Sequence, residues 1–392
     1  MGEIHTDQTK NTEPSSPGPR GGVDSESRGS PQDPEPPGGN PGFQSGRRLP
    51  GRLRVGITFN LKKNIPSEVP DAEAEFDDMD TIRAIQNALE TAGHVVTLCE
   101  ATEELPFRLF QNRPNIVFNI AEGMNGRGRE AQVPAILNFL GIPFTGSDET
   151  TMCVAMDKAL TKRLVASYGV DTPEYKVIKH DDFLTGTDSL PDLGLCWPVI
   201  VKPNTEGSGK GISDISIVGD SAALRRVLTE KIQSYKEDML VEEYISGREF
   251  TVGILGNGGD LRVFPPMEII FKDKTHCIYS YEVKRNFRRY VRYECPPNID
   301  ADIRKKIETA AAAVYRALEC RDAARMDFRL SPEGRLYFIE INPLPGLAPG
   351  YSDLPFIAAF CGMDYATLIR NILDSALARY GLRHKNTAGQ IQ

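Results

Sequence analysis

The sequence predicts an α/β protein with three lobes: an N-terminal parallel α/β domain, a small central α+β lobe and a C-terminal lobe with a mixed sheet. The first observation is the length of 392 residues, which exceeds that of one average domain. The second is that strands alternate with helices over residues 51–150, a pattern typical of a parallel sheet. The third is that strands follow one another closely in two further regions, residues 151–255 and 256–383.

Charge and composition argue against several classes of protein. The net charge is −8 and the pI about 5.4, whereas proteins that coat nucleic acid or anionic membranes present a basic surface. Seven cysteines include no CxxC pair and cannot all pair, so we expect a reducing compartment. No stretch approaches the roughly eighteen apolar residues of a membrane span, and no secretory signal is evident. We therefore expect a soluble cytoplasmic protein with a small-molecule partner, and neither nucleic acid nor membrane.

The two ends of the chain differ in composition from the rest. Residues 1–50 are rich in Pro, Gly and Ser and hold almost no large apolar side chains, so we predict a disordered tail. Residues 384–392 are expected to form a flexible C-terminus. A transit peptide is disfavoured because such peptides avoid acidic residues. The tail contains Glu3, Asp7, Glu13, Asp24, Glu26, Asp33 and Glu35. A partner-binding tail and a simple solvated extension both stay open.

The first lobe shows the alternation most clearly. Strands are expected at residues 52–60, 95–100 and 114–122, with an amphipathic helix between the first two that ends at Gly93. Functional groups gather at the C-terminal ends of parallel strands, so the loop EGMNGRGRE after the third strand is a candidate for function. A helix over about residues 132–140 and the turn GIPFTGSDE close the lobe near Thr150.

The central lobe begins with the helix MDKALTKRLVASYG, which has Lys158 near its start, and continues with the segment VIVKPNTEGSGKGIS. This segment does not match the phosphate-binding pattern G-x-x-x-x-G-K-[ST], because Asn204 and Gly211 occupy two required positions. A strand follows it, so we predict a hairpin tip whose backbone N–H groups bind an anion. An ordinary glycine turn is the alternative, but Lys202 at a strand end favours a phosphate site.

The segment MLVEEYISGREF contains Glu242 and Glu249 on either side of an apolar-polar run. This run fits a hinge strand whose backbone binds an adenine edge while a carboxylate further on holds ribose hydroxyls. A strand with two solvated glutamates is the simpler alternative for this fragment.

The strongest signal is the segment RMDFRLSPEGRLYFIEINPLPG. Two strands joined by the turn SPEG place Asp327 on one strand and Glu340 and Asn342 on one face of the other. Buried carboxylates on facing strands are costly unless a cation pairs with them, and Mg²⁺ prefers oxygen ligands. Such ions would bridge the phosphates of ATP. A set of cross-strand salt bridges with Arg325 and Arg329 is the alternative.

These motifs, taken in order, resemble the ATP-grasp superfamily and, within it, the D-alanyl-D-alanine ligase family. The resemblance extends from about Val55 to the end of the globular part. It rests on LGIPFTGS, AMDKALTK, VIVKPNTEGSGKGI, LVEEYISGREFTVGIL, YSYEVK, RMDF and IEINPLPG. Each motif alone is weak, whereas the ordered set is highly specific. The resemblance implies an ADP-forming carboxylate-amine ligase that works through an acyl phosphate and uses ATP with Mg²⁺, or Mn²⁺ in its place.

Carried over residue by residue, the resemblance implies four groups of site residues. The nucleotide contacts are Lys158, Lys202, Glu206, Gly207, Ser208, Gly209, Glu242, Tyr244, Ile245, Glu249 and Lys284. The metal ligands are Asp327, Glu340 and Asn342. The catalytic residues, which stabilise charge during acyl transfer, are Arg325, Ser208, Gly346 and Lys284. The substrate residues are Glu75, Glu122, Arg129, Arg285, Arg325, Gly346 and Ser352. Glu75 is expected to receive the first substrate's amino group, and Ser352 the second substrate's carboxylate.

The chain departs from the D-alanyl-D-alanine ligase pattern at three places. IAEGMNGRGRE replaces a His-Gly pair after the third strand, Arg285 replaces an aromatic residue after the loop lysine, and PLPG replaces Thr-x-Pro-Gly. Added arginines suggest a substrate with a second carboxylate, or a longer or more acidic one, because guanidinium binds carboxylate bidentately. Surface arginines are the alternative. The resemblance implies small amino-acid or peptide substrates and leaves a homodimer open.

Several functions therefore stay open at this point. The D-alanyl dipeptide is the leading product, and a ligase for another amino acid or short peptide is the runner-up. An ATP-binding protein of the same fold that ligates nothing is a third reading, although it has little reason to retain three metal ligands and three phosphate-facing lysines. A kinase of this fold is a fourth, and it would form ADP without free phosphate.

Overall fold

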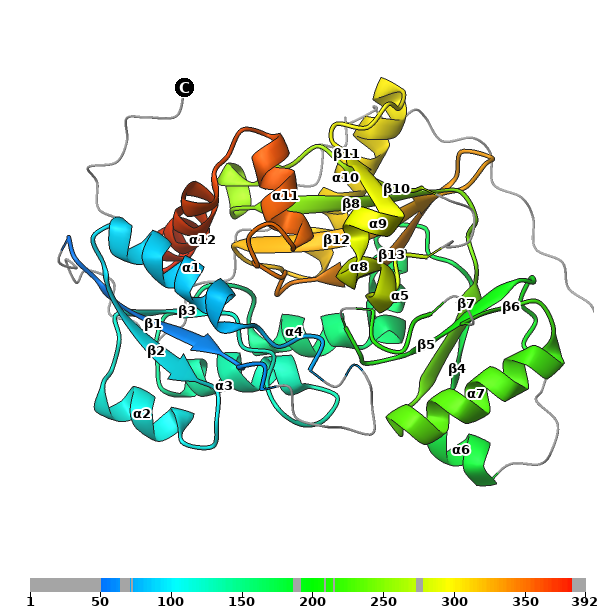
Figure 1. Ribbon diagram of the computed structural model, residues 1–392, viewed down its shortest axis with the longest axis horizontal. Helices are drawn as coiled ribbons and strands as arrows, with labels where there is room; N and C mark the ends of the chain where they lie inside the picture. The colour runs from blue at the N-terminus through cyan, green and yellow to red at the C-terminus, as the bar shows by residue number, and fades with distance from the viewer. Residues whose placement is uncertain are drawn as a thin grey trace, which may run out of the picture. The chain divides into compact units, whose positions relative to one another are not determined.

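The described part of the chain forms three β-sheets, whose arrangement can be followed in Figure 1. The structure is a computed structural model that describes residues 51–63, 71, 73–185, 192–207, 209–213, 216–272 and 278–382. The expected disordered tail (1–50), the expected flexible C-terminus (384–392) and Ser208 lie outside the described residues.

The first sheet is parallel, which confirms the prediction from the alternating strands and helices. Its order is β2–β1–β3, with β1 (Arg54–Phe59) between β2 (Val95–Glu100) and β3 (Ile116–Asn119). Helix α1 (Met79–Thr91) begins after Asp78, whose carboxylate accepts a hydrogen bond from the backbone of Thr81 at 2.8 Å. The other helical elements here are α2 (Leu105–Gln111), the 3₁₀ turn η1 (Arg129–Ala131) and α3 (Gln132–Phe139).

Two helices connect the first lobe to the second. They are α4 (Glu149–Met156) and α5 (Lys158–Ser167), and Asp157 separates them. The Asp157 carboxylate accepts from the backbone N–H of Leu160 at 3.0 Å and so starts α5. The predicted helix therefore begins where the sequence suggested, and its first residue is Lys158.

The second sheet is antiparallel, with the order β4–β7–β5–β6. Its elements are β4 (Tyr175–Ile178), α6 (His180–Thr185), β5 (Val199–Pro203), β6 (Ile217–Val218), α7 (Ser221–Tyr235) and β7 (Met239–Glu243). The pairing of Val199 with Val218 confirms the predicted hairpin around the glycine loop, although β6 is only two residues long. Apolar side chains of α7 cover one face of this sheet.

The third sheet is also antiparallel, with the order β11–β10–β8–β12–β13, and β9 pairs with β8. The mixed sheet predicted for this lobe is therefore wrong, since every strand pair described in it is antiparallel, the arrangement that tight turns such as SPEG allow. Its strands are β8 (Arg248–Leu255), β9 (Arg262–Val263), β10 (Met267–Phe271), β11 (Val291–Glu294), β12 (Ala323–Leu330) and β13 (Leu336–Asn342). Its helical elements are η3 (Gly258–Asp260), α8 (Tyr281–Arg285), α9 (Phe287–Tyr290), α10 (Ala301–Ala317), α11 (Asp353–Phe360) and α12 (Tyr365–Arg379).

Strand β8 corrects one boundary of the sequence analysis. We placed residues 248–255 at the end of the central lobe, but β8 pairs along its whole length with β12 of the third sheet. Sequence order alone suggested that β7 and β8 form one hairpin lobe. The structure instead uses β8 as the central strand of the next sheet, so the boundary lies between β7 and β8.

The largest hydrophobic core joins the first and last parts of the chain. Helix α12 lies beside α1 (Figure 1), and their apolar side chains pack with those of β1, β3 and α11. Among the described residues no single helix is long and apolar enough to cross a membrane. Only α11 and α12 taken together reach that length, and a bend of 107° separates them.

Candidate active site

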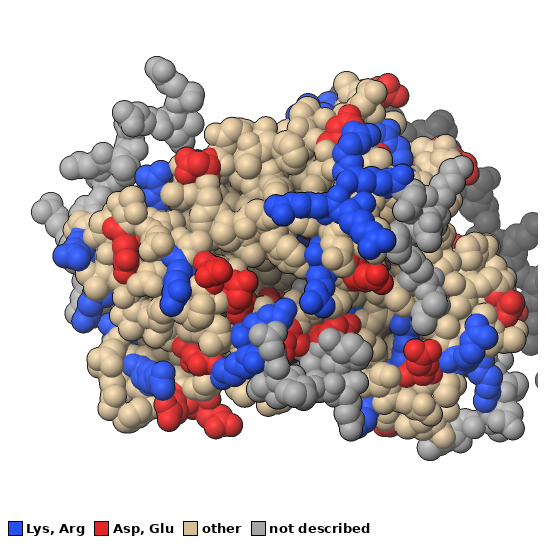
Figure 2. All heavy atoms as spheres, in the orientation of Figure 1, with Lys and Arg blue, Asp and Glu red and all other residues tan. Residues whose placement is uncertain are grey.

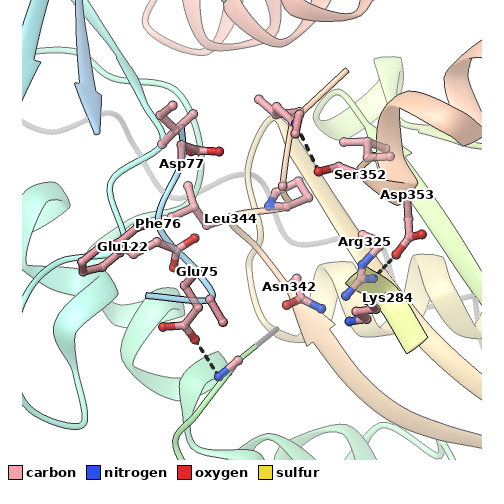
Figure 3. Close-up of a pocket in the computed structure, with 18 of the residues that line it drawn as sticks. Glu75, Phe76, Asp77, Glu122, Lys284, Arg325, Asn342, Leu344, Ser352 and Asp353 are labelled. Carbon is pink, nitrogen blue, oxygen red and sulfur yellow. Dashed lines mark hydrogen bonds and ion pairs between the residues drawn. The ribbon is translucent and has the colours of Figure 1, made fainter. Parts of the chain in front are cut away.

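A cavity of about 860 Å³ opens between the first lobe and the β12–β13 hairpin. Figure 2 shows this face of the molecule hollowed near its centre, with acidic and basic side chains on the rim. One wall is formed by residues 73–78 together with Glu122 and Glu130 of the first lobe. The other wall is formed by helix α8 and by residues 340–354 after the end of β13. Figure 3 shows how the side chains of the two walls face one another.

The β12–β13 hairpin brings the three expected metal ligands together. In the strand pairing Asp327 is opposite Glu340, and Arg325 is opposite Asn342. The turn SPEG closes with a hydrogen bond from the Gly334 N–H to the Ser331 carbonyl at 2.9 Å. The Oδ1 atom of Asp327 and the Nδ2 atom of Asn342 are buried and have no hydrogen-bond partner in the described part of the chain. Orphaned buried polar atoms are rare in folded proteins, so this pair indicates a binding site.

Three lysines direct positive charge at this hairpin. Burial alone would raise the pKa of Glu340, but the nearby ammonium groups of Lys158, Lys284 and Lys202 outweigh it and lower that pKa. Burial raises the pKa of Asp327, and the negative charge of Glu340 adds to this effect. The two facing carboxylates thus differ, since the positive charge nearby favours the ionised form of Glu340 more than that of Asp327.

The hairpin residues fit a hard divalent cation. Asp327 and Glu340 supply carboxylate oxygens and Asn342 supplies an amide oxygen, all of which can serve as metal ligands. One of them, Oδ1 of Asp327, has no hydrogen-bond partner in the described part of the chain. The amide of Asn342 can present its oxygen in place of its nitrogen by turning about its last bond. Within the described ranges, no group of three His, Cys, Asp or Glu side chains forms a metal site. A cation bound by Asp327 and Glu340 would therefore need further ligands, from Asn342 or from a bound nucleotide.

A second, smaller cavity of about 70 Å³ gathers the residues expected around the adenine and ribose. Its lining contains Lys202, Gly209, Glu242, Tyr244, Ile245 and Glu249, together with Lys284, Asp327 and Glu340. Lys284 and Glu340 line both cavities, so the two cavities adjoin each other. Glu249 is not a fully solvated glutamate, since its side chain is only 14% exposed and accepts a hydrogen bond from Arg329 at 2.5 Å.

Glu242 has a different contact from the one expected. Its carboxylate lies between two buried ammonium groups, that of Lys202 and that of Lys162, whose Nζ is 2.9 Å from Oε2. Lys162 also donates to the carbonyl oxygen of Ile339 at 3.2 Å. Sequence analysis missed Lys162. A signal was available, because Lys162 lies four residues after Lys158 and so on the same face of α5.

The glycine loop is held against the first lobe. The N–H of Gly207 donates to Glu75 Oε1 at 2.7 Å, and the N–H of Gly211 donates to Asp71 Oδ2 at 2.9 Å. Gly209 has a φ of +74°, a conformation that other residues adopt only with strain. The side chain of Glu206 forms an ion pair with Lys210 at 2.5 Å. Gly207 and Gly211 are thus held by the first lobe, and Gly207 lines the large cavity.

Two residues expected to bind substrate are instead bound to each other. Arg129 donates from Nη2 to both oxygens of Glu75, at 2.8 and 2.7 Å, and from Nε to Oε2 at 3.2 Å. Its remaining contacts are Glu206 Oε2 at 3.0 Å and the carbonyl of Thr205 at 3.1 Å. In this conformation most of the N–H donors of Arg129 are engaged by the protein itself. The structural reason is burial, which makes an internal ion pair necessary for a guanidinium.

Other carboxylates of the same wall face the cavity without such a partner. Figure 3 shows Glu122 and Asp77 beside Glu75 on this wall. Burial and the charge of Glu130 raise the pKa of Glu122 well above its ordinary value. Burial likewise raises the pKa of Glu130 to about 8 and that of Asp77 to about 7. These three carboxyl groups are therefore costly to ionise unless a positive charge comes near, and of the three only Glu122 was identified from the sequence.

The opposite wall contains the remaining expected residues. Lys284 and Arg285 end helix α8, and both line the cavity. Gly346 is packed against Ser352, since a Cβ placed on it would lie 2.8 Å from Ser352 Oγ. That Oγ accepts a hydrogen bond from the N–H of Ala348 at 3.1 Å, which fixes the loop after β13. Its hydroxyl proton remains available to a ligand.

Arg325 lies where the sequence placed it, with a partner that the sequence did not reveal. Its Nη2 is 3.2 Å from Asp327 Oδ2, as expected from their shared face of β12. Its Nη1 donates to Asp353 Oδ2 at 2.6 Å. Asp353 follows Ser352 in the chain, and no motif indicated that it reaches the hairpin.

This chain is similar in sequence to known proteins of one family. The family model described as "D-ala D-ala ligase C-terminus" matches residues 164–374. A D-alanine–D-alanine ligase of Gloeobacter violaceus is 34% identical over 307 residues, which are 75% of this chain and 93% of that protein. The chain belongs to the D-alanine–D-alanine ligase family. An uncharacterized protein of Sinorhizobium fredii, y4sG, is also 34% identical, over 75% of this chain and 86% of its own.

A solved structure supports the family assignment at the level of the fold. The D-alanine–D-alanine ligase from Bacillus anthracis, crystallised with ATP, matches 84% of this chain and 98% of its own, with a TM-score of 0.64 and 22% identity. The three-lobe ATP-grasp architecture predicted from the sequence is therefore confirmed.

Proposed function

We propose that this chain joins the carboxyl group of one amino acid to the amino group of a second and releases ADP and phosphate. Its family makes it an enzyme of the ADP-forming, ATP-dependent ligase class. The D-alanyl dipeptide is the leading product, because the D-alanine–D-alanine ligases of Gloeobacter violaceus and Aquifex aeolicus match three quarters of this chain.

One observation carries the proposal. The orphaned oxygen of Asp327 and the orphaned amide of Asn342 lie on a hairpin that also holds Glu340, at a point on which Lys158, Lys202 and Lys284 converge. A folded protein has no structural reason to leave a buried carboxylate oxygen unpaired beside surplus positive charge. A bound triphosphate with a divalent cation satisfies both kinds of group at once.

The reaction follows from charge balance. A carboxylate oxygen of the first amino acid attacks the γ-phosphorus of ATP, the bond to the β–γ bridging oxygen breaks, and ADP leaves. The amine of the second amino acid then attacks the acyl carbon, phosphate leaves, and the amine loses a proton. Negative charge grows on the phosphate oxygens and on the acyl oxygen, and fixed cations stabilise it most effectively where water is excluded. No side-chain nucleophile is required.

The chain's own residues divide these tasks. Lys158 and Lys202 bind phosphate oxygens from the floor of the site, and Lys284 binds them from helix α8. The guanidinium of Arg325 and the backbone of Gly346 stabilise the acyl oxygen. Asp327, Glu340 and Asn342 hold a divalent cation, Mg²⁺ or Mn²⁺, which supplies charge screening between the phosphates when it is bound.

The substrate groups are assigned by charge. On the first-lobe wall an ammonium group of an amino acid would favour the ionised form of buried carboxyl groups such as Glu122 and pair with them. Ser352 and Arg285, on the opposite wall, offer donors to a carboxylate. We also place the enzyme in the cytoplasm, because the six described cysteines are all free and a reducing compartment keeps them so.

A substrate screen tests this proposal. ADP and phosphate are measured with a library of D- and L-amino acids and dipeptides, and the amide product is identified by mass. We expect equal amounts of ADP, phosphate and a dipeptide with at least one D-amino acid. ADP without free phosphate would instead indicate a kinase. No amino-acid-dependent ADP release from any member of the library would overturn the ligase assignment.

A further inference from the structure

Asp353 is placed unusually for the first residue of a helix. A carboxylate at the start of a helix commonly faces solvent, where it interacts with the N-terminal end of the helix. Asp353 begins α11 but is only 7% exposed, and Figure 3 shows its side chain turned toward Arg325. Its Oδ2 accepts from Arg325 at 2.6 Å, and its Oδ1 accepts from the hydroxyl of Tyr279 at 3.2 Å. The Asp353 carboxylate thus accepts hydrogen bonds from two side chains of the cavity wall.

Arg325 is shared unequally between two buried carboxylates. Its contact with Asp353 is 2.6 Å, whereas its contact with Asp327 is 3.2 Å. A guanidinium presents several donors in one plane, so it can bind both carboxylates at once. Its single positive charge cannot fully neutralise both of them. The shorter contact shows that the guanidinium leans toward Asp353.

The second oxygen of Asp327 remains without a partner. In the described part of the chain, Oδ1 of Asp327 is buried and accepts no hydrogen bond. A guanidinium beside a carboxylate ordinarily forms two parallel hydrogen bonds with it, which would engage both oxygens. The pull of Asp353 on Arg325 explains why this two-bonded pair does not form here.

We propose that Asp353 is a positioning residue that holds Arg325 to one side, so that Asp327 keeps an oxygen available for a divalent cation. Without the Asp353 carboxylate, Arg325 turns fully onto Asp327, and the arginine and the cation compete for the same carboxylate. The inference rests on the proposed function for the need of a cation at this hairpin.

The same carboxylate connects the hairpin with helix α8. Tyr279, which donates to Asp353, lies just before α8, and its hydroxyl is 2.5 Å from that of Tyr293 in β11. The Nζ of Lys284 lies 5.1 Å from the centre of the Tyr279 ring. Replacing Tyr279 by Phe removes one of the two hydrogen bonds that orient Asp353 and leaves the ion pair with Arg325. The variant Tyr279→Phe is therefore a weaker version of Asp353→Asn.

Metal binding without turnover tests the proposal directly. Mn²⁺ binding in the presence of ADP is measured by electron paramagnetic resonance for the full-length wild type, Asp353→Asn, Tyr279→Phe and Glu268→Gln. We expect Asp353→Asn to weaken Mn²⁺ binding by about tenfold or more, the usual effect of losing a group that orients metal ligands. Tyr279→Phe should weaken it less. Glu268→Gln removes another buried carboxylate of the same sheet, which pairs with the partly exposed Arg248 at 2.6 Å, and should leave Mn²⁺ binding unchanged.

A second measurement separates this role from a general loss of stability. In phosphate release, Asp353→Asn should shift the half-saturating Mg²⁺ concentration upward, with excess Mg²⁺ restoring most of kcat and with little change in the KM for ATP. A merely structural defect would lower kcat at every Mg²⁺ concentration.

The outcomes that overturn the proposal are definite. They are wild-type Mn²⁺ affinity in Asp353→Asn, an equal loss in Glu268→Gln, or no Mn²⁺ binding by the wild type itself. If Asp353→Asn does not fold, wild-type Mn²⁺ affinity in Tyr279→Phe overturns it instead. A wild type that binds Mn²⁺ with ADP but releases no phosphate with any amino acid contradicts the proposed function, while the Mn²⁺ comparison still decides the role of Asp353.

Discussion

Glu75 and Asp327 are both buried carboxylates beside an arginine, on opposite walls of one cavity, and their surroundings differ. Glu75 accepts three hydrogen bonds from Arg129, at 2.7 to 3.2 Å, and a fourth from the backbone of Gly207 at 2.7 Å. Asp327 is 3.2 Å from Arg325, and its Oδ1 accepts no hydrogen bond from the described residues. Glu75 is thus satisfied by the protein itself, whereas Asp327 is not.

This difference separates a structural carboxylate from a binding carboxylate. Burying a charged group costs free energy unless partners replace its lost water, and Glu75 has those partners. At Asp327 the unfavourable free energy of burial is only partly offset, and a bound cation would offset more of it. Glu75 therefore joins the first lobe to the glycine loop, while the unsatisfied oxygen of Asp327 marks where we place the divalent cation.

The largest expected effect comes from removing the unsatisfied charge. Asp327→Asn should lower the rate of ADP release by roughly 10²-fold to 10³-fold, the usual effect of losing one electrostatic group of an active site. The unfolding midpoint should change little, because Arg325 keeps its shorter ion pair with Asp353 when the charge of Asp327 is removed. Steady-state ADP release and thermal unfolding, measured side by side, check both halves of this expectation.

The variant Glu340→Gln serves as a companion to Asp327→Asn. Both residues belong to the same hairpin, so both variants should lose activity while staying folded. A wild-type rate in either variant would contradict the assignment of the hairpin as the site of phosphate chemistry.

The next effect concerns stability. Arg129→Met leaves Glu75 and Glu206 without their shared guanidinium, and breaking a buried ion pair from one side costs about 3–5 kcal/mol. Urea unfolding measures this loss as a lower midpoint at unchanged slope. The double variant Glu75→Gln/Arg129→Met should recover part of it, because it also removes a charge that the single variant leaves unpaired. No recovery would mean that Arg129 acts through packing alone.

A smaller effect depends on pH. Burial raises the pKa of Glu130 to about 8, from an ordinary value of 4.5. Between these two values the folded chain binds more protons at Glu130 than the unfolded chain does, so the free energy of unfolding falls as pH rises. Glu130→Gln should flatten this decline and raise the unfolding midpoint at pH 8 but not at pH 4. Parallel pH profiles for the variant and the wild type would show that Glu130 is not the group responsible.

The smallest effect is expected at an exposed ion pair. Arg335 lies 3.0 Å from Asp171, with side chains that are 58% and 47% exposed. Water screens such a pair, and the side chains lose entropy when they form it. Arg335→Ala should leave both ADP release and the urea midpoint unchanged. It is the control for Arg129→Met, because each removes an arginine from an ion pair and only the burial differs.

Much of this arrangement was predictable from local pattern. The hairpin that pairs Asp327 with Glu340 follows from alternation along two strands and the turn SPEG. Lys158 at the start of α5 follows from Asp157 as its capping residue. The position of β8 in the third sheet was not predictable, since an edge strand of one sheet and a central strand of the next have the same local pattern.

The partners of charged side chains were also beyond the reach of sequence pattern. Arg129 was expected to bind substrate, but it binds Glu75, which is 54 residues away in the chain. Arg325 was expected beside Asp327, but its shorter contact is with Asp353, 28 residues away. Ion pairs of this kind have no spacing rule, because any two charges that folding brings together within a few ångströms can form one.

The amino-acid sequence by itself determined the kind of chemistry: phosphate-facing lysines, a hairpin with oxygen ligands and a glycine loop, each encoded within a few residues. Only the tertiary structure decided which of the charges are already neutralised and which await a ligand. The physical reason is that secondary structure depends on neighbours in the chain, whereas the cost of a buried charge depends on every group within a few ångströms, wherever it lies in the sequence.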